Sequence, residues 1–428
     1  MNTANFKTGT IWVRDNLHIM RGMNSECVDL IYLDPPFKSD VKYRGLPTDF
    51  GGDGVVKAEF DDMWKMRPQD EEWHKSLKED DRCLYEVIEA SGYSFGDDMK
   101  SYLIYMTARL FEMHRILKET GSIYLHCDHH AGHYLKIIMD CIFDKSNFRN
   151  EIIWCYTGPS NTRKWFPRKH DTILFYSKGK NSKFNKNDVT VPYKMIGIGK
   201  GDSIFSDGDD EKRVEELLKR GKVPEDWWAD DHLTNVSAWR GERTGYPTQK
   251  PLKLLERIIK ASSDEDDLVL DPFCGCATAL IAAEKENRKW IGIDLSPVAR
   301  FLIRNRMRRE TNLLDTYNPI SRIDPPIRTD VQKDAKETKG ETRQRLYIEQ
   351  DKMCNGCFWN IPLHILNDDH KTPTSHGGQD VPDNIQLLCG TCNSIKGNRD
   401  MSYLHARLKE LGYMNPDYMD NVWLNKSS

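Results

Sequence analysis

The chain has 428 residues, a length typical of two or three folded units and ample for a sizeable core. Lysine and arginine number 62 against 66 aspartates and glutamates, so the formal net charge of -4 excludes a uniformly basic protein. It does not exclude a nucleic-acid-binding face, because phosphate contacts need only a local basic patch.

Short apolar runs that end in polar or glycine-rich turns, each followed by helical periodicity, predict an α/β fold with a doubly wound, Rossmann-like sheet. The predicted strands cover residues 28–33, 122–126, 172–176, 268–270 and 290–293. The predicted helices cover residues 99–119, ended by Gly121, then 133–143, 251–261, 278–285 and 297–309.

The periodicity fades over residues 180–240, a polar stretch that we interpret as an inserted segment outside the sheet, part of which we expect to act as a target-recognition segment. Residues 315–340 are rich in Pro, Asp, Lys and Thr and predict a linker between a first domain, 1–314, and a small second domain, 341–428. Basic clusters at residues 163–169 and 300–309 fit either a DNA-binding face or an ordinary solvated surface.

The N-terminus lacks the apolar run of a secretory signal, and no stretch approaches the ~18 apolar residues that span a bilayer. We therefore expect a cytosolic, cytoplasmic protein with no membrane partner. In that reducing compartment eleven cysteines do not indicate a disulfide framework. Seven of them occur singly or in apolar runs, and four near the C-terminus form a pattern of their own.

Two strand ends carry the motifs of a nucleotide-type site. The segment VLDPFCGCATALIAAE forms a strand, a glycine turn and a helix start, and Asp294 ends the next strand 19 residues after Gly275. That spacing suits a carboxylate that accepts hydrogen bonds from ribose hydroxyls. The segment VDLIYLDPPF ends a second strand in Asp34, which should face Asp294 across the crevice at the carboxyl ends of the strands.

The second segment suits chemistry on the exocyclic amine of a base. That amine is a poor nucleophile, and acceptors for both of its N–H bonds would direct its lone pair at a methyl donor. Asp34 and the Pro35 carbonyl can be these acceptors, and Phe37 can stack on a base turned out of the duplex. Asp324-Pro325-Pro326 repeats the tripeptide without a preceding apolar run, and we interpret it as a turn.

These segments resemble the β-class DNA amino-methyltransferases, in which the target-base motif precedes the cofactor motif, and among them the modification subunits of type III restriction systems. The resemblance covers residues 8–309 and implies S-adenosylmethionine as cofactor and double-stranded DNA as partner; a homodimer stays open. It also implies the site residues. In the catalytic motif these are Asp34, Pro35, Pro36 and Phe37, and around the cofactor they are Lys250, Asp271, Phe273, Gly275, Thr278 and Asp294.

The chain departs from the family at the glycine turn, where DPFCGCATA replaces the usual DPFCGSGTT. Ala277 requires a backbone conformation that tolerates a Cβ atom, which could lower the affinity for the cofactor. We still expect the cofactor to bind, because Asp271, Gly275, Thr278 and Asp294 are present. An aspartate-first DPPF is typical of the adenine enzymes, so adenine is favoured over cytosine N4. No Pro-Cys dipeptide occurs, so methylation of cytosine carbon through a covalent cysteine is unsupported.

Near the C-terminus, Cys354, Cys357, Cys389 and Cys392 form two CxxC pairs, a strong signature of a closed, structural zinc site. The stretch between them resembles the HNH, or ββα-metal, endonucleases over residues 346–398. That resemblance implies His370 as general base, Asp369 and Asn393 as ligands of Mg²⁺ or a similar divalent cation, and Asn384 as a loop brace.

Several alternatives stay open at this stage. The zinc domain can be a non-catalytic DNA clamp, the target base can be cytosine, and a degenerate cofactor turn would fit a non-enzymatic DNA-binding regulator. A metal at His126, Asp128, His129, His130 and His133 is less favoured, because in the family this stretch is a strand end and a helix start.

Overall fold

The computed structural model describes residues 3–36, 42–44, 59–61, 68–158, 162–192, 216, 219–229, 233, 244, 249–311, 319–330, 339–350, 352–381 and 384–415. It divides into two compact units, Met1–Asp324 and Pro325–Ser428. None of the helices in the described ranges combines the length and apolar character needed to cross a bilayer.

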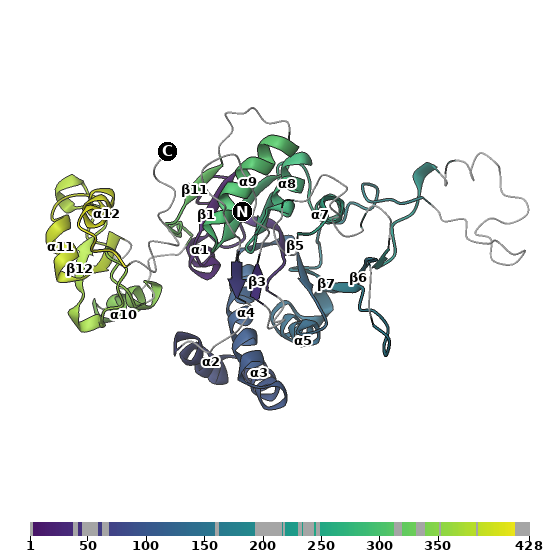
Figure 1. The fold of residues 1–428 in the computed structure, drawn as a ribbon, viewed down its shortest axis with the longest axis horizontal. Coiled ribbons are helices and arrows are strands. Elements are labelled where there is room, and N and C mark those ends of the chain that lie inside the picture. The colour runs from purple at the N-terminus through teal and green to yellow at the C-terminus, as the bar shows by residue number, and fades with distance from the viewer. Residues whose placement is uncertain are drawn as a thin grey trace, which may run out of the picture. The chain divides into compact units, whose positions relative to one another are not determined.

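The described part of the first unit is built on a nine-stranded sheet with the order β11-β1-β10-β9-β2-β5-β7-β6-β8 (Figure 1). The central strands are parallel, whereas β7 runs antiparallel to β5 and β6. The strands are β1 (Thr10–Val13), β2 (Val28–Leu33), β5 (Leu117–Cys127), β6 (Phe148–Cys155), β7 (His170–Ser177), β8 (Trp227–Trp228), β9 (Leu268–Asp271), β10 (Lys289–Asp294) and β11 (Ile320–Arg322). A separate antiparallel pair joins β3 (Lys42–Arg44) to β4 (Glu59–Asp61).

Helices cover both faces of the large sheet. The helices are α1 (Asn16–Gly22), α2 (Pro68–Asp80), α3 (Arg82–Phe95), α4 (Asp97–Ile116), α5 (Gly132–Phe143), α7 (Leu252–Ser262), α8 (Thr278–Lys285) and α9 (Pro297–Glu310), with a short 3-10 turn, η1 (Lys145–Asn147). One apolar layer packs α1, α3, α4 and α5 against the sheet, and a second packs α7, α8 and α9. Along β2, Ile31 and Leu33 enter the first layer and Leu30 and Tyr32 the second, so every residue of this strand is buried.

The doubly wound sheet is confirmed, and each predicted strand and helix has a counterpart. The strand at residues 28–33 and the helix at 278–285 agree residue for residue. The helix predicted to run to residue 119 is wrong at its end, because α4 stops at Ile116 and β5 begins at once. Gly121 lies inside β5, where an added Cβ would sit 2.8 Å from the Asp29 carbonyl oxygen. This glycine allows two strands to approach and does not cap a helix.

Two predicted non-sheet segments contribute strands. Within residues 180–240, β8 pairs parallel with β6, and Trp228 is buried with its indole N–H donated to the Glu225 carbonyl at 2.9 Å. Within the predicted linker, β11 pairs parallel with β1. Both strands are two or three residues long, too short to give a periodic pattern in the sequence.

The second unit contains a two-stranded antiparallel sheet followed by a helix, which is the predicted ββα arrangement (Figure 1). Its elements are α10 (Lys339–Glu349), η4 (Leu363–Ile365), β12 (Asn367–His370), η5 (Thr374–His376), β13 (Ile385–Leu388), α11 (Gly390–Lys396) and α12 (Met401–Glu410). Its small core includes Leu387, Leu388, Leu404 and Leu408 together with the four clustered cysteines.

Candidate active site and metal centre

The connections that leave β9 and β2 run in opposite directions across the sheet. After β9 the chain passes through α8 to β10, and after β2 it passes through α4 to β5 on the other side. The switch point therefore lies between the carboxyl ends of two adjacent parallel strands, where open α/β sheets bind ligands. Asp271 ends β9, Asp294 ends β10 and Asp34 directly follows β2, so the three predicted site carboxylates share this edge.

The Asp34 carboxylate is held on one oxygen only. The Lys250 ammonium lies 2.7 Å from Oδ2, and the two side chains are 7% and 19% exposed. Oδ1 is buried and has no hydrogen-bond partner within the described ranges. Because a buried acceptor without a partner is costly, Oδ1 is the kind of atom that a ligand N–H group would satisfy.

The carboxyl edge brings three carboxyl groups together, and burial raises the pKa of two of them. Burial raises the pKa of Asp271 well above its usual value, and the carboxylates of Asp34 and Asp294 raise it further, opposed by Lys250. Burial also raises the pKa of Asp294, against hydrogen bonds from the Ser296 and Gly275 amides. These bonds measure 2.7 and 2.8 Å and fix the Asp294 carboxylate over the glycine turn. A cationic ligand at this edge would favour the ionised form of both carboxyl groups.

The turn after β9 adopts the strained conformation that its sequence implies. Ala277 has φ of 65° and ψ of 32°, in the left-handed region that costs a residue with a Cβ atom about 1–2 kcal/mol. Arg306 of α9 is buried and donates to the Cys276 carbonyl at 2.7 Å and to the Thr278 hydroxyl at 3.0 Å. Interpreting the basic cluster at 300–309 as one exposed face is therefore wrong for Arg306, which stabilises the turn.

A buried hydrogen-bond chain lies beside this edge. The Tyr32 hydroxyl contacts His126 Nδ1 at 3.0 Å, and His126 Nε2 contacts the Asp171 carboxylate at 3.2 Å. Tyr156 donates its hydroxyl to the other oxygen of Asp171 at 3.1 Å. The chain crosses β2, β5 and β7 and fixes the carboxyl ends of β2 and β5 against the start of the antiparallel β7.

The remaining predicted residues of the first site are placed as follows. Pro35 is buried, Pro36 is half-buried, and Phe37 lies outside the described residues. Phe273 donates its amide to Asp271 at 3.0 Å, and its ring lies 6.5 Å from that of Tyr105. His126 belongs to the buried chain, while Asp128, His129 and His130 lie close enough together to hold an ion but are mostly exposed.

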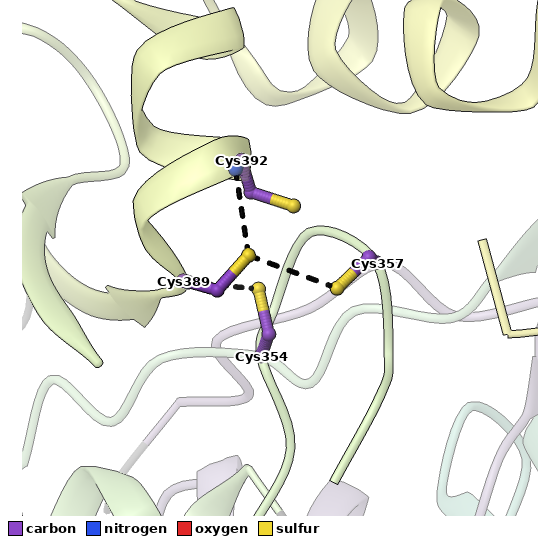
Figure 2. A group of neighbouring side chains, drawn as sticks. All are labelled: Cys354, Cys357, Cys389 and Cys392. Carbon is purple, nitrogen blue, oxygen red and sulfur yellow. Dashed lines mark hydrogen bonds between the residues drawn. The ribbon is translucent and has the colours of Figure 1, made fainter. Parts of the chain in front are cut away.

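In the second unit the four predicted cysteines converge. All four are buried, their sulfur atoms lie within 4.8 Å of one another, and Figure 2 shows them pointing toward a common centre. The Cys389 amide donates to the Cys354 sulfur at 3.1 Å. Tetrahedral zinc with Zn–S bonds of about 2.3 Å needs sulfurs about 3.8 Å apart, and the Cys357 and Cys389 sulfurs are 4.0 Å apart. The donor set therefore fits a closed zinc site.

The predicted nuclease residues lie on β12 and α11. His370 Nε2 contacts the Asp380 carboxylate at 3.0 Å, which orients the imidazole. The neighbouring Asp369 carboxylate lies 3.0 Å from the buried Lys396 ammonium. Asn393 lies one helical turn before Lys396, so it shares the face of α11 from which Lys396 reaches Asp369.

The loop after His370 is braced by Asn384, whose side chain bonds Thr372 and the Gln379 carbonyl, each at 2.9 Å. The Lys396 ammonium also donates to the His370 carbonyl at 2.7 Å, which joins α11 to the end of β12. These contacts hold the predicted general base against the helix that carries Asn393.

The family model described as DNA methylase matches residues 28–301, well over half of the chain. The chain belongs to the DNA methylase family. A second model, described as HNH endonuclease, matches residues 354–399. The protein is therefore a DNA methyltransferase of the restriction-modification type that carries an HNH domain.

The relatives of this DNA methylase include type II enzymes. The type II methyltransferase M.HpaI of Haemophilus parainfluenzae is 30% identical over 59% of this chain and 79% of that protein. The DNA adenine methyltransferase YhdJ of Escherichia coli is 27% identical over 67% of this chain and 78% of YhdJ. The resemblance to amino-methyltransferases is thus confirmed, with relatives of type II where the sequence suggested type III modification subunits.

Among solved structures, the PvuII DNA methyltransferase (cytosine-N4-specific) covers 73% of this chain and 91% of its own at 16% identity, with a TM-score of 0.42. Because this score is low, the fold assignment rests on the strand order and the family match.

Some site contacts of the methylase unit were not foreseen from the sequence. Asn16 donates to the Pro272 carbonyl at 2.8 Å, and buried Arg109 bonds both Asn16 and Asp15 at 2.6 Å. These residues stand far from the cofactor motif in the chain and carry no motif of their own. The Lys250–Asp34 pair was also missed, since Lys250 was assigned to the cofactor.

Proposed function

We propose that the protein transfers a methyl group from S-adenosylmethionine to the N6 amine of adenine in double-stranded DNA. The observation that carries this proposal is the buried Oδ1 atom of Asp34, which has no partner among the described residues while Lys250 holds Oδ2. An extruded adenine would satisfy Oδ1 with one N–H, and the Pro35 carbonyl would accept the other.

The chain's own residues would act on the amine. Asp34 and the Pro35 carbonyl would orient the nitrogen lone pair toward the methyl carbon, and Phe37 would stack on the base. S-adenosylmethionine would supply an electrophilic methyl group on a sulfonium centre. With the new N–C bond made and the C–S bond broken, sulfur would keep the electron pair and the nitrogen would release one proton to solvent.

The residues at the carboxyl edge fit that cofactor. Its sulfonium is cationic, and the carboxyl groups of Asp34, Asp271 and Asp294 line this edge beside Lys250. Asp294 would face the ribose hydroxyls, and Phe273, Gly275 and Thr278 would line the adjoining wall. The strained turn at Ala277 is stabilised by Arg306, which donates to the Cys276 carbonyl before it and the Thr278 hydroxyl after it.

Adenine is favoured over cytosine because the motif begins with aspartate and because YhdJ is named an adenine methyltransferase. The test is nucleoside analysis of DNA methylated in vitro, with long-read sequencing to give the target sequence. N6-methyladenine is the expected product. N4-methylcytosine would overturn the choice of base, and no product despite bound cofactor would favour a non-enzymatic regulator.

Lys250 is proposed to position Asp34 rather than to bind the cofactor. Replacing Lys250 with methionine removes the ammonium and leaves the carboxylate free to rotate, so we expect the methyl-transfer rate to fall by about ten- to a hundredfold. The affinity for S-adenosylmethionine, measured by calorimetry, should change less than about threefold. If that affinity falls in step with the rate, Lys250 belongs to the cofactor site.

A second activity, DNA cleavage or nicking by the HNH unit, is supported by the contact between His370 and Asp380. His370 would act as general base on water, and Asp369 and Asn393 would hold a divalent cation such as Mg²⁺, which stabilises charge on the scissile phosphate. Their oxygen donors suit that ion, although Lys396 now supplies the positive charge beside Asp369.

The expected result is Mg²⁺-dependent nicking of supercoiled plasmid that falls at least about a hundredfold in His370→Ala. The matched control is His364→Ala, a change of the same kind in the 3-10 turn η4 of the same unit. Absence of nicking by the unaltered protein on unmethylated and methylated plasmid would favour the non-catalytic clamp.

A further inference from the structure

Among the described residues, the loop between β6 and β7 carries strongly exposed aromatic and basic side chains near the methylase site. In it Trp165 is 65% exposed and Phe166 is 94% exposed, which is unusual for rings of this size. The flanking residues Arg163, Lys164 and Arg168 are exposed as well. The proposed target-base site does not use this segment, so its composition needs another explanation.

The strand register puts this loop at the same edge of the sheet as Asp34. Leu33 pairs with Leu125 in β5, Cys127 pairs with Thr172 in β7, and β7 pairs with the end of β6. The loop therefore leaves β6 and enters β7 at this same edge, three and two strands from β2. With strands spaced about 4.8 Å apart, that separation is about 10–14 Å, within the reach of one bound duplex.

The loop is anchored at its base while its tip faces solvent. Arg168 contacts His129 Nε2 at 3.0 Å, and the Tyr156 amide donates to the Lys169 carbonyl at 3.0 Å. Tyr156 is tied in turn to Asp171 and so to the buried chain beside the active site. A fixed base with an exposed aromatic tip is suited to insertion into another molecule.

We propose that residues 162–169 bind duplex DNA beside the target base, with Phe166 inserted between bases and Arg163 and Lys164 on the flanking phosphates. Proteins that kink or open a duplex use such apolar wedges, and cations beside them give affinity without sequence preference. The wedge would fill part of the gap that the extruded adenine leaves. This inference rests on the proposed methyl transfer to an extruded base.

The kinetic test compares single-turnover methylation of two duplexes, one with the target adenine paired to thymine and one with an abasic site opposite it. Phe166→Ala should be about ten- to a hundredfold slower than the unaltered protein on the paired duplex. On the abasic duplex the two should agree within about threefold, because the base is already unpaired. An equal loss of rate on both duplexes would show that Phe166 does not act as a wedge.

The matched control is Phe184→Ala. Phe184 is 49% exposed and lies at the opposite edge of the sheet, where the backbone amide of its neighbour Lys183 donates to the Thr120 carbonyl at 3.2 Å. This variant should match the unaltered protein on both duplexes. If Phe166→Ala behaves as Phe184→Ala does, the inference is wrong.

A measurement of DNA binding does not depend on methyl transfer, so it tests this inference separately from the proposed function. Fluorescence anisotropy with a labelled duplex should show Phe166→Ala binding about tenfold more weakly, and Arg163→Ala and Lys164→Ala each lowering the salt slope by about 1. Lys186→Ala, beyond the opposite edge, should leave that slope unchanged. Methylation by the unaltered protein reports the proposed function, and unchanged binding in all three loop variants would overturn the inference.

Discussion

Replacing Asp34 with asparagine is expected to lower the single-turnover rate of methyl transfer by at least about a hundredfold while S-adenosylmethionine still binds. Asparagine keeps the shape of the side chain and removes the charge that the amine nitrogen would face as it becomes positive. The loss should appear in the transfer step, because Asp34 is proposed to contact the base and not the cofactor. Rates with labelled cofactor and affinities from calorimetry measure the two effects.

The control for this change lies on the same strand. Asp29 is buried near the start of β2 and pairs with Lys118 at 2.8 Å, so Asp29→Asn disturbs a carboxylate that is even more deeply buried than Asp34 and lies at the opposite edge of the sheet. It should lower the melting temperature without a comparable loss of rate. If Asp29→Asn and Asp34→Asn lose activity equally, the effect is one of stability, and the assigned role of Asp34 is wrong.

Removing zinc is expected to unfold the unit Pro325–Ser428 and leave methyl transfer in place. Zinc binding to four thiolates contributes about 10–16 kcal/mol at neutral pH, as much as the whole stability of a typical domain of about 5–15 kcal/mol. The four cysteines are part of the unit's small core, so their separation would also expose Leu387 and Leu404. One zinc ion per chain should be released by a strong chelator, with rapid proteolysis of this unit.

Cys389→Ser should reproduce the loss of zinc, whereas Cys83→Ser, a change at an exposed cysteine of the other unit, should keep the full zinc content. A second unit that stays folded and protease-resistant without metal would contradict the zinc assignment. Activity assays on both variants show whether the methylase unit works without its folded neighbour.

The sequence predicted the central sheet because its strands are buried on both faces and so appear as continuous apolar runs, as β2 does. It failed where the signal is short or ambiguous. The strands β8 and β11 have only two or three residues. Glycine is common both at helix ends and where two strands approach closely, so the sequence alone does not show which role Gly121 has. Only the three-dimensional neighbours distinguish these cases.

In the candidate site, too, some residues could be predicted from the sequence and others could not. Asp34, Asp271 and Asp294 could be predicted because each stands at the end of an apolar run, and parallel strands bring such ends to one edge. The partners of these carboxylates could not be predicted. Lys250 is 216 residues from Asp34, and Arg306 belongs to a helix whose arginines all look alike in sequence until burial separates them.

The pairing of β1 with β11 sets the first and last strands of the methylase unit side by side, and the Trp12 indole donates to the carbonyl of Asp324, the last residue of that unit. A chain whose ends meet can be closed there and opened at another surface loop without changing any strand pair. Circular permutation would thus reverse the order of the DPPF and DPFCG segments and leave β2 beside β9. In this fold, the order of the two motifs along the chain can therefore change without changing which strands are paired.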